Sequence, residues 1–403
     1  MSPEAHLLTT DQVAARLGVK TATVYAYVSR GLLPSIRNAR GKGSLFAKPD
    51  VDAFVAARQR PTTPGIRTGI TLIRDGRLYY RGHDAIRLAQ TATFEAVATL
   101  LWTGDLPPAD NRKDADDAGF DPKPALTVLA AETIRPLPPE ARITDRLRVI
   151  VAAAAAADPL RFDTNPTAVI GAGRALLATM VTALPQAANL TTAEKGPLAE
   201  RLWRRLTIRE PSDDDRRLLN AALVLLADHD IAASTLAARV AASTRANPYA
   251  VVGAGLAALD GPFHGAASGL AYALLQEAII SEEPISTVAD RLRVDGLIPG
   301  FGHALYPDGD PRATALLAML PDGEVRDVAA HLVDAVESRS GTRPNVDFAL
   351  AALSLQNDMP PDAGEAIFAV ARTAGWLAHA LEEYAARPSR FRPVGQYSGT
   401  APR

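Results

Sequence analysis

Residues 299–313 read PGFGHALYPDGDPRA, residues 343–353 read RPNVDFALAAL, and these two stretches decide the fold. Each sets chemically active side chains inside apolar sequence: His303 and Arg312 in the first, Asp347 in the second. The apolar residues that surround them recur at the spacing of helices. Buried polar groups need a partner or a ligand, so both stretches are candidates for a functional site.

Two further segments have the same character. His229 lies in LLADHDIAAST at 225–235, and His264 lies in DGPFHGAASG at 260–269. A lone histidine is more often structural than catalytic, but four such segments in one chain indicate a common site. We expect no metal there, because no two of these histidines and Asp347 have the three- or four-residue spacing of a helical metal site.

Outside these segments the pattern from residue 67 onward predicts an almost entirely helical body. Strand alternation occurs only in ITLIRDGRLYYRG at 70–82, where Asp75-Gly76 predicts a hairpin turn. The polar stretch 107–124 predicts an exposed connection. Gly-X-Gly strings at 171–173 and 253–255 lack the strand–turn–helix context of a nucleotide fingerprint, so we interpret them as helix-packing glycines.

Composition excludes several classes of protein. The 403 residues are 47% hydrophobic and 22% charged, a globular balance that is incompatible with disorder. The absence of cysteine excludes disulfides, thiolate zinc sites and cysteine nucleophiles, and it fits a reducing cytosol. The first residues show no secretion signal, and no apolar run is long enough to span a membrane. We therefore expect a cytoplasmic protein.

The first 60 residues differ from the rest in charge. They contain nine lysines and arginines against four acidic residues, a net charge of +5, whereas the remainder carries −7. Residues 8–28, LTTDQVAARLGVKTATVYAYV, predict two short helices joined by a turn, which is a helix-turn-helix. The sequence IRNARGKGSLF at 36–46 predicts a hairpin, and residues 50–57 predict a closing helix. RPTTPG at 60–65 predicts a linker.

This arrangement resembles the winged helix-turn-helix of excisionases and MerR-type regulators, and a basic module of this kind suits double-stranded DNA. The second helix would then enter the major groove and the wing would contact phosphates. A module for protein contacts is the alternative. The residues expected on DNA are Thr21, Thr23 and Tyr25 on the helix and Arg37, Arg40 and Lys42 on the wing.

Residues 67–403 resemble the citrate synthases. The segments around the three histidines and Asp347 follow in that family's order, after the opening YYRGHDAIRLAQTATFEAVATLLWTGDLP at 79–107. ARTAGWLAHALEE at 371–383 and RFRPVGQYSG at 390–399 resemble the family's C-terminal helix and tail. The resemblance implies an all-α, two-domain body that works as a homodimer. It implies condensation of acetyl-CoA, a co-substrate, with oxaloacetate, and no further cofactor.

The resemblance also implies a role for each site residue. Asp347 would remove a proton from the thioester methyl group, His264 would donate a hydrogen bond to the thioester oxygen, and His303 would polarise the oxaloacetate carbonyl. Oxaloacetate is a dianion, and the planar fork of arginine suits its carboxylates. The residues expected to bind it are His229, Arg312, Arg372 and, from the partner subunit, Arg392. Surface ion pairs are the alternative for the arginines.

The local sequence predicts the ionisation states of two site residues, His264 and Asp347. His264 follows Gly261-Pro262, which predicts a helix start, where the positive end of the helix dipole would keep the imidazole neutral. Asn345 predicts an N-cap, and a carboxylate in the first turn of a helix would have a lowered pKa. Asp347 would then be a weak base until closure of the site excludes water.

Several positions depart from the family pattern. The usual HGGANE is HGAASG at 264–269, and the usual GHRVYK has Ala304 and Pro307 in place of its Arg and Lys. The tail motif RPR ends in Val394, and residues 349–351 are ALA instead of YSG. These changes affect the expected coenzyme A contacts and the acyl-chain preference rather than the condensation.

We expect a winged helix-turn-helix over 1–60, a large domain over 67–265 and 355–403, and a small domain over 266–354. Two rival functions stay open. The first is a 2-methylcitrate synthase that uses propionyl-CoA, since one methylene changes binding by only about 1–3 kcal/mol. The second is a transcription regulator whose body senses metabolites, although such a sensor needs no base aimed at a methyl group.

Overall fold

The computed structural model describes residues 7–17, 19–29, 33–37, 43–59, 65–107, 120–187, 196–281, 283–295, 298–392 and 399. The chain divides into two compact units, Met1–Arg67 and Thr68–Arg403. No helix among the described residues is long and apolar enough to cross a membrane.

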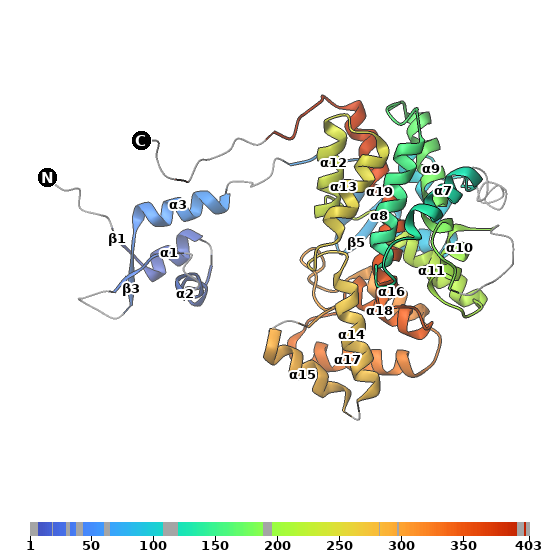
Figure 1. Ribbon diagram of the computed structural model, residues 1–403. Helices are drawn as coiled ribbons and strands as arrows, with labels where there is room; N and C mark the ends of the chain where they lie inside the picture. Colours follow the sequence, from blue (N-terminus) through green and yellow to red (C-terminus); the bar gives the residue numbers. More distant parts are fainter. Residues whose placement is uncertain are drawn as a thin grey trace. The chain divides into compact units, whose positions relative to one another are not determined.

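The first unit is a small helical module with a three-stranded sheet (Figure 1). Its helices are α1 (Thr10–Leu17), α2 (Thr21–Ser29) and α3 (Lys48–Gln59), and its strands are β1 (Leu7–Thr9), β2 (Ile36–Arg37) and β3 (Ser44–Ala47). The strand order is β1-β3-β2, all antiparallel. Val13, Val24 and Phe46 form its core with no exposed surface.

The predicted helix-turn-helix and closing helix are confirmed. Strands β2 and β3 pair antiparallel with Arg37 opposite Ser44, as the predicted wing requires, and the tip between them, with Arg40 and Lys42, lies outside the described residues. Strand β1 was not predicted. Its residues Leu7–Thr9 read as the approach to the first helix, and only pairing with β3 makes them a strand.

The second unit begins with the predicted hairpin. Strands β4 (Thr71–Arg74) and β5 (Arg77–Tyr80) pair antiparallel, and β6 (His83–Asp84) adds a short third strand. The turn residues Asp75 and Gly76 both have positive φ, 52° and 70°. That backbone twist matches the twist of the strands, which is why Asp-Gly is favoured there.

The remaining elements that the structure describes in the second unit are helices. The described helices are α4 (Ala85–Thr91), α5 (Phe94–Thr103), α7 (Pro124–Ile134), α8 (Ile143–Ala157), α9 (Pro166–Thr182), α10 (Leu198–Leu206), α11 (Asp213–Leu226), α12 (Ala233–Ser243), α13 (Pro248–Leu259), α14 (Ala267–Ile280), α15 (Pro284–Asp295), α16 (Pro311–Met319), α17 (Glu324–Ser340), α18 (Val346–Gln356) and α19 (Ala363–Ala385).

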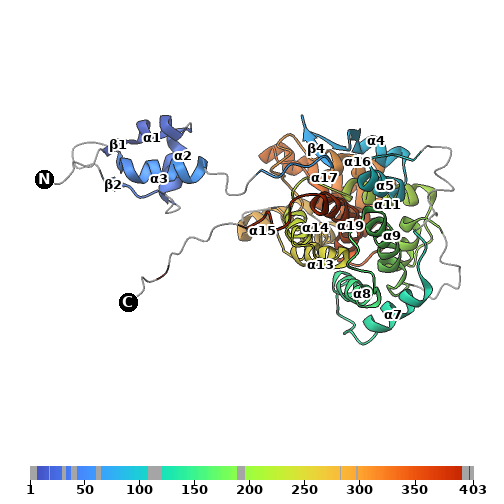
Figure 2. The same cartoon turned by 90° about the horizontal axis from the view of Figure 1, so that it is seen from above.

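Helix α19 is the centre of this unit (Figure 2). It packs against α5, α8, α9, α11, α12 and α13, and most of its 23 residues are buried. A Cβ at Gly255 of α13 would lie 2.5 Å from the Trp376 ring, so this glycine lets the two helices approach closely. This contact confirms helix packing as the role of Gly255, whereas a Cβ at Gly253 would meet nothing within 4 Å.

Helices α14, α15, α17 and α18 pack on one another at the other end of the unit (Figure 1). The division into a large and a small domain at residues 266 and 354 stays a prediction. Two caps in this region position the site. The Asp310 side chain accepts from the Arg312 N–H at the start of α16, and the Asn345 side chain accepts from the Asp347 N–H at the start of α18.

Candidate active site

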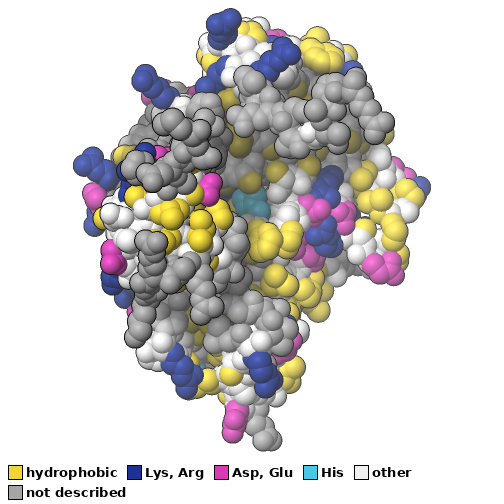
Figure 3. All heavy atoms as spheres, turned by 90° about the vertical axis from the view of Figure 1, so that its left-hand side faces the viewer, with side chains coloured by type: hydrophobic (Ala, Val, Ile, Leu, Met, Phe, Trp, Pro, Cys, Tyr) yellow, Lys and Arg dark blue, Asp and Glu magenta, His cyan; other side chains and the backbone are white. Residues whose placement is uncertain are grey.

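One cavity of about 670 Å³ brings together six of the seven residues expected to act on oxaloacetate and the acyl thioester. They reach it from the loop after α11, the turn before α14, the loop before α16, and the helices α16, α18 and α19. Figure 3 shows one face of the molecule, where a histidine side chain lies at the bottom of a hollow flanked by hydrophobic side chains. The six residues are His229, His264, His303, Arg312, Asp347 and Arg372.

Asp347 is a half-buried carboxyl group whose Oδ1 is shielded from solvent. Burial raises its pKa from 3.8 to about 7, against the opposing charge of Arg312. Its Oδ1 has no hydrogen-bond partner among the described residues. The expected lowering of this pKa was wrong. Asn345 does cap α18, but the loss of solvent outweighs the helix dipole at a single first-turn carboxylate.

His264 is neutral at physiological pH. Burial lowers its pKa to about 4, with a further contribution from the charge of Arg372. The expected neutrality is thus confirmed, but its expected cause was wrong, because α14 begins three residues later at Ala267. Nε2 lies 2.7 Å from the Ser234 hydroxyl. When that hydroxyl donates, Nε2 carries no proton and Nδ1 is the donor.

His229 and His303 lie edge to face, with ring centroids 5.3 Å apart. Burial lowers the pKa of both, and Arg312 lowers each further. The Leu305 backbone N–H donates to Nδ1 of His303 at 3.1 Å, so the proton of the neutral ring is on Nε2. His229 pairs through Nε2 with the Tyr306 hydroxyl at 3.0 Å. Both histidines can therefore act as neutral hydrogen-bonding groups.

Arg312 is buried and ion-paired. Its Nε and Nη2 donate to the two oxygens of Asp310 at 3.0 and 2.8 Å, and its exposed fraction is 2%. Asp310 also accepts from the Val346 N–H at 3.1 Å, which links α16 to α18. A surface ion pair is excluded for Arg312, since its partner is an interior carboxylate that fixes the guanidinium against the cavity.

Arg372 is the other buried cation of the cavity. Its Nε donates to the Leu226 carbonyl at 2.8 Å, whereas Nη1 and Nη2 have no hydrogen-bond partner in the described part of the chain. Burial lowers its pKa, and the nearby Asp228 carboxylate opposes that shift. A buried guanidinium with two unused amino groups is unfavourable unless an anion binds there. A substrate carboxylate meets that need.

Arg392 does not line this cavity. It is exposed and follows α19 beyond the last turn of the body. Its role therefore stays a prediction that requires a second subunit.

Helix α2 exposes two of the three side chains that we expect to contact DNA. Thr21 and Tyr25 of α2 are exposed, Tyr25 by 47%, and Thr23 is half-buried. Arg37 lies at the end of β2. DNA contact itself stays a prediction.

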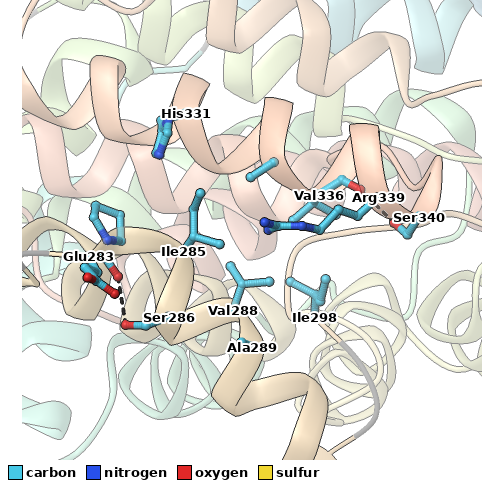
Figure 4. Close-up of a pocket in the computed structure, with 12 residues that line it drawn as sticks. Glu283, Ile285, Ser286, Val288, Ala289, Ile298, His331, Val336, Arg339 and Ser340 are labelled. Carbon is cyan, nitrogen blue, oxygen red and sulfur yellow. Dashed lines mark hydrogen bonds between the residues drawn. The ribbon is translucent and has the colours of Figure 1, made fainter.

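A second cavity of about 670 Å³ lies between α15 and α17 (Figure 4). Ile285, Val288 and Val336 line it, with His331 and Arg339 exposed at its edge. None of the residues predicted for the site lies there. It lacks a group of converging buried polar side chains, so it offers no equivalent chemistry.

Sequence reasoning missed four residues of the first cavity or its immediate support. Ser234 and Asp310 are ordinary polar residues in sequence, and Tyr306 and Phe368 are ordinary aromatic ones. Phe368 packs edge to face on His264, with centroids 5.5 Å apart. Asp310 in the DGDPR string carried a detectable signal, because an acidic residue before proline is a typical N-cap.

Comparison with known proteins agrees with this geometry. The family model for the citrate synthase C-terminal domain matches residues 62–394, and a helix-turn-helix domain model matches residues 7–59. Curated relatives include 2-methylcitrate synthase 2 of Corynebacterium glutamicum, 29% identical over 80% of this chain and 88% of that protein. Another is citrate synthase 2 of Bacillus subtilis, which is 29% identical over 82% of this chain and 93% of that protein.

Solved structures show the same fold. One of them is the ternary complex of citrate synthase from Thermoplasma acidophilum with carboxymethyl coenzyme A and oxaloacetate. It has a TM-score of 0.71, is 26% identical, and covers 85% of this chain and 96% of its own. The fold, the converging histidines and carboxylate, and the matched length together show that the chain belongs to the citrate synthase family and carries a helix-turn-helix domain at its N-terminus.

Proposed function

We propose that the protein condenses acetyl-CoA with oxaloacetate to give citrate and CoA. The observation that carries this proposal is the position of Asp347 in one cavity with His264 and His303: its Oδ1 is shielded from solvent and its pKa is raised to about 7. A base that acts on carbon needs such a pKa at neutral pH. No cofactor beyond the acyl-CoA substrate enters the reaction.

The proton transfer uses two groups together. Asp347 takes a proton from the thioester methyl group while Nδ1–H of His264 donates a hydrogen bond to the thioester oxygen, which gives an enolate stabilised by that hydrogen bond. The methyl carbon then forms a bond to the keto carbon of oxaloacetate, and Nε2–H of His303 supplies a proton to the keto oxygen. The proton that Asp347 took from the methyl group is released to solvent, and His303 takes up a proton from solvent, so that both side chains return to their starting states. Water then cleaves the thioester, releasing citrate and CoA. Donors placed where negative charge develops stabilise each step.

The dianion is held by the cations of the cavity. Arg372 offers two unused amino groups, and Arg312 is kept in place by Asp310. His229 contributes a neutral imidazole beside His303. Charge-assisted hydrogen bonds to carboxylates are about twice as strong as neutral ones, so these groups select oxaloacetate over uncharged ketones.

We further infer a homodimer in which Arg392 completes the partner's site. In its own subunit Arg392 is exposed and outside the cavity. Large apolar side chains are exposed on or after α7 and α8, with Val128 at 63%, Leu160 at 75% and Phe162 at 65%. Exposed apolar surface of this kind favours a protein contact.

Propionyl-CoA is the alternative acyl donor, because a 2-methylcitrate synthase is among the relatives. Free thiol released from acetyl-CoA or propionyl-CoA, with and without oxaloacetate, separates the possibilities. Higher kcat/KM with acetyl-CoA supports the proposal, and higher kcat/KM with propionyl-CoA replaces it by the alternative. Release of no thiol from either would favour a metabolite-sensing regulator. We expect the reaction to take place in the cytoplasm.

For the N-terminal unit we propose binding to double-stranded DNA. The exposed Thr21 and Tyr25 on α2 and the basic composition of the first 60 residues support it. Phosphate contacts release counterions, so the affinity must fall steeply with salt. Binding that does not depend on salt, or no binding, would favour a module for protein contacts.

A further inference from the structure

Behind the arginine side of the cavity lies a chain of buried charged groups that the reaction does not use. It begins at Asp228, the fully buried neighbour of His229 in sequence. The Thr71 hydroxyl of β4 donates to Oδ2 of Asp228, and the Tyr80 hydroxyl of β5 donates to its backbone carbonyl at 2.9 Å. His379 of α19 lies 3.3 Å from Oδ2 through Nε2.

The protonation of His379 follows from its two partners. Nη1 of Arg239 contacts Nδ1 of His379, and a guanidinium can only donate. Nδ1 therefore carries no proton, and Nε2–H donates to Asp228. The direction of hydrogen bonding is thus fixed from Arg239 through His379 to Asp228, with all three side chains at most 1% exposed.

Arg239 is held in turn by two neighbouring glutamates of α19. Its Nε donates to Glu383 at 2.6 Å, and its Nη1 donates to Glu382 at 2.8 Å. Glu382 also accepts from the Gly69 N–H at 2.9 Å, where the body begins after the linker. Glu383, fully buried, pairs with Arg390, two residues before Arg392.

The inner end of this chain touches the site. The charge of Asp228 acts on Arg372 and opposes the lowering of its pKa, and Nη1 and Nη2 of Arg372 have no hydrogen-bond partner in the described part of the chain. A Cβ at Gly375 would lie 2.5 Å from Oδ1 of Asp228, so only glycine lets α19 approach this carboxylate. Displacement of Asp228 would therefore shift Arg372 and His229 together, since one is on α19 and the other is next in sequence.

We propose that Asp228, His379 and Arg239 form a positioning chain for the oxaloacetate-binding side of the cavity, which Glu383 and Arg390 extend to the base of the C-terminal tail. His379 acts through Asp228 and touches no substrate, so it is a positioning residue. The proposal rests on the proposed function, because it concerns the same site. It predicts that the chain governs oxaloacetate affinity and leaves the acyl-CoA side unaffected.

The first test compares two substitutions of His379 in the full-length protein. In His379→Gln an amide can still donate to Asp228 and accept from Arg239, whereas in His379→Leu it can do neither. We expect His379→Leu to weaken oxaloacetate binding about tenfold, because it leaves buried hydrogen-bonding groups of Asp228 and Arg239 without a partner. His379→Gln should weaken it by no more than about threefold, because the amide can replace both hydrogen bonds. His83→Leu, at an exposed histidine of β6, is the matched control and should change nothing.

Oxaloacetate affinity is measured by titration calorimetry, which needs no turnover, and KM for each substrate is measured by thiol release. An inactive wild-type protein that binds oxaloacetate would therefore refute the proposed function alone. Equal effects of the Leu and Gln variants, or equal losses for oxaloacetate and acyl-CoA, would overturn the positioning chain. Thr71→Val, which removes only a hydroxyl, is a milder variant in case His379→Leu does not fold. It should raise the oxaloacetate KM about threefold.

The outer end is tested at Arg390. Arg390→Gln removes the charge that pairs with Glu383, and we expect it to raise the oxaloacetate KM about threefold, the effect of a weakened charge-assisted pair. In an Arg392→Ala background the same change should cause no further loss of oxaloacetate affinity in titration calorimetry, because the tail then carries nothing to position. Additive effects of the two substitutions would show that Arg390 acts independently of the tail.

Discussion

The substitution Asp347→Asn should lower activity and raise stability. A general base typically contributes 10²- to 10⁴-fold to the rate, so we expect kcat to fall by at least about 10²-fold while oxaloacetate binding stays nearly intact. The pKa of about 7 also sets the pH dependence of the wild-type enzyme. Because the base acts when deprotonated, kcat/KM should rise with pH through about 7 and reach roughly a tenth of its plateau at pH 6.

The effect on stability follows from the same pKa. In the unfolded chain Asp347 titrates near 3.8, and in the folded protein near 7, so the folded state binds more protons between these values. The stabilising contribution of the protonated carboxyl is fully present below pH 3.8 and is lost as the pH rises through 7. At about 1.4 kcal/mol per pKa unit, ionisation at pH 8 costs about 4 kcal/mol. An amide has the shape of the protonated acid and avoids that cost.

The measurement is urea unfolding of both proteins at pH 8, together with thiol-release kinetics from pH 5.5 to 9. We expect Asp347→Asn to exceed the wild type in free energy of unfolding by up to about 4 kcal/mol at pH 8, and by progressively less as the pH falls. A variant that is both inactive and less stable at pH 8 would show that the carboxylate is stabilised by its surroundings. A rate that stays flat from pH 8 to 5.5 would refute the assigned pKa of the base.

Three further predictions concern the ends of the chain. Removal of residues 1–62 should leave condensation kinetics largely unchanged, because the second unit begins at Thr68; a large loss of kcat would show that the first unit supports the site. The intact protein should bind duplex DNA with an affinity that falls steeply between about 50 and 200 mM salt, because each phosphate contact releases counterions from the DNA. A binding titration at several salt concentrations measures this slope. Arg392→Ala should weaken oxaloacetate binding by about 2 kcal/mol. Mixing inactive Arg392→Ala subunits with inactive Asp347→Asn subunits should restore up to about a quarter of the wild-type rate. After random exchange half of the dimers are mixed, and each mixed dimer has one intact site of two. Recovery near zero with subunit exchange confirmed by a tag would mean that Arg392 does not act across the interface.

The ionisation of the site shows where prediction from sequence ends. Asn345 was correctly expected to cap a helix, yet the consequence drawn for Asp347 had the wrong sign. A cap is local, and two residues of sequence specify it. Desolvation depends on every chain segment around the carboxyl group, and the cavity in which Asp347 lies is lined by residues of α14, α16 and α19 as well as α18. The neutral state of His264 was predicted from the dipole of a helix start, but the structure shows that burial is its main cause.

Sequence by itself determined the helical body, the hairpin at Asp75-Gly76, the helix-turn-helix and the residue types of the site, because periodicity, turn chemistry and motif spacing act over a few residues. Tertiary structure alone decided that strand β1 exists, that Ser234 supports His264, and that Asp228, His379 and Arg239 join behind Arg372. These residues are up to 151 positions apart, the separation of Asp228 and His379. Strand pairing, burial and charge pairing depend on distance in space, and only the packing of α19 against its neighbours brings such residues within hydrogen-bonding reach.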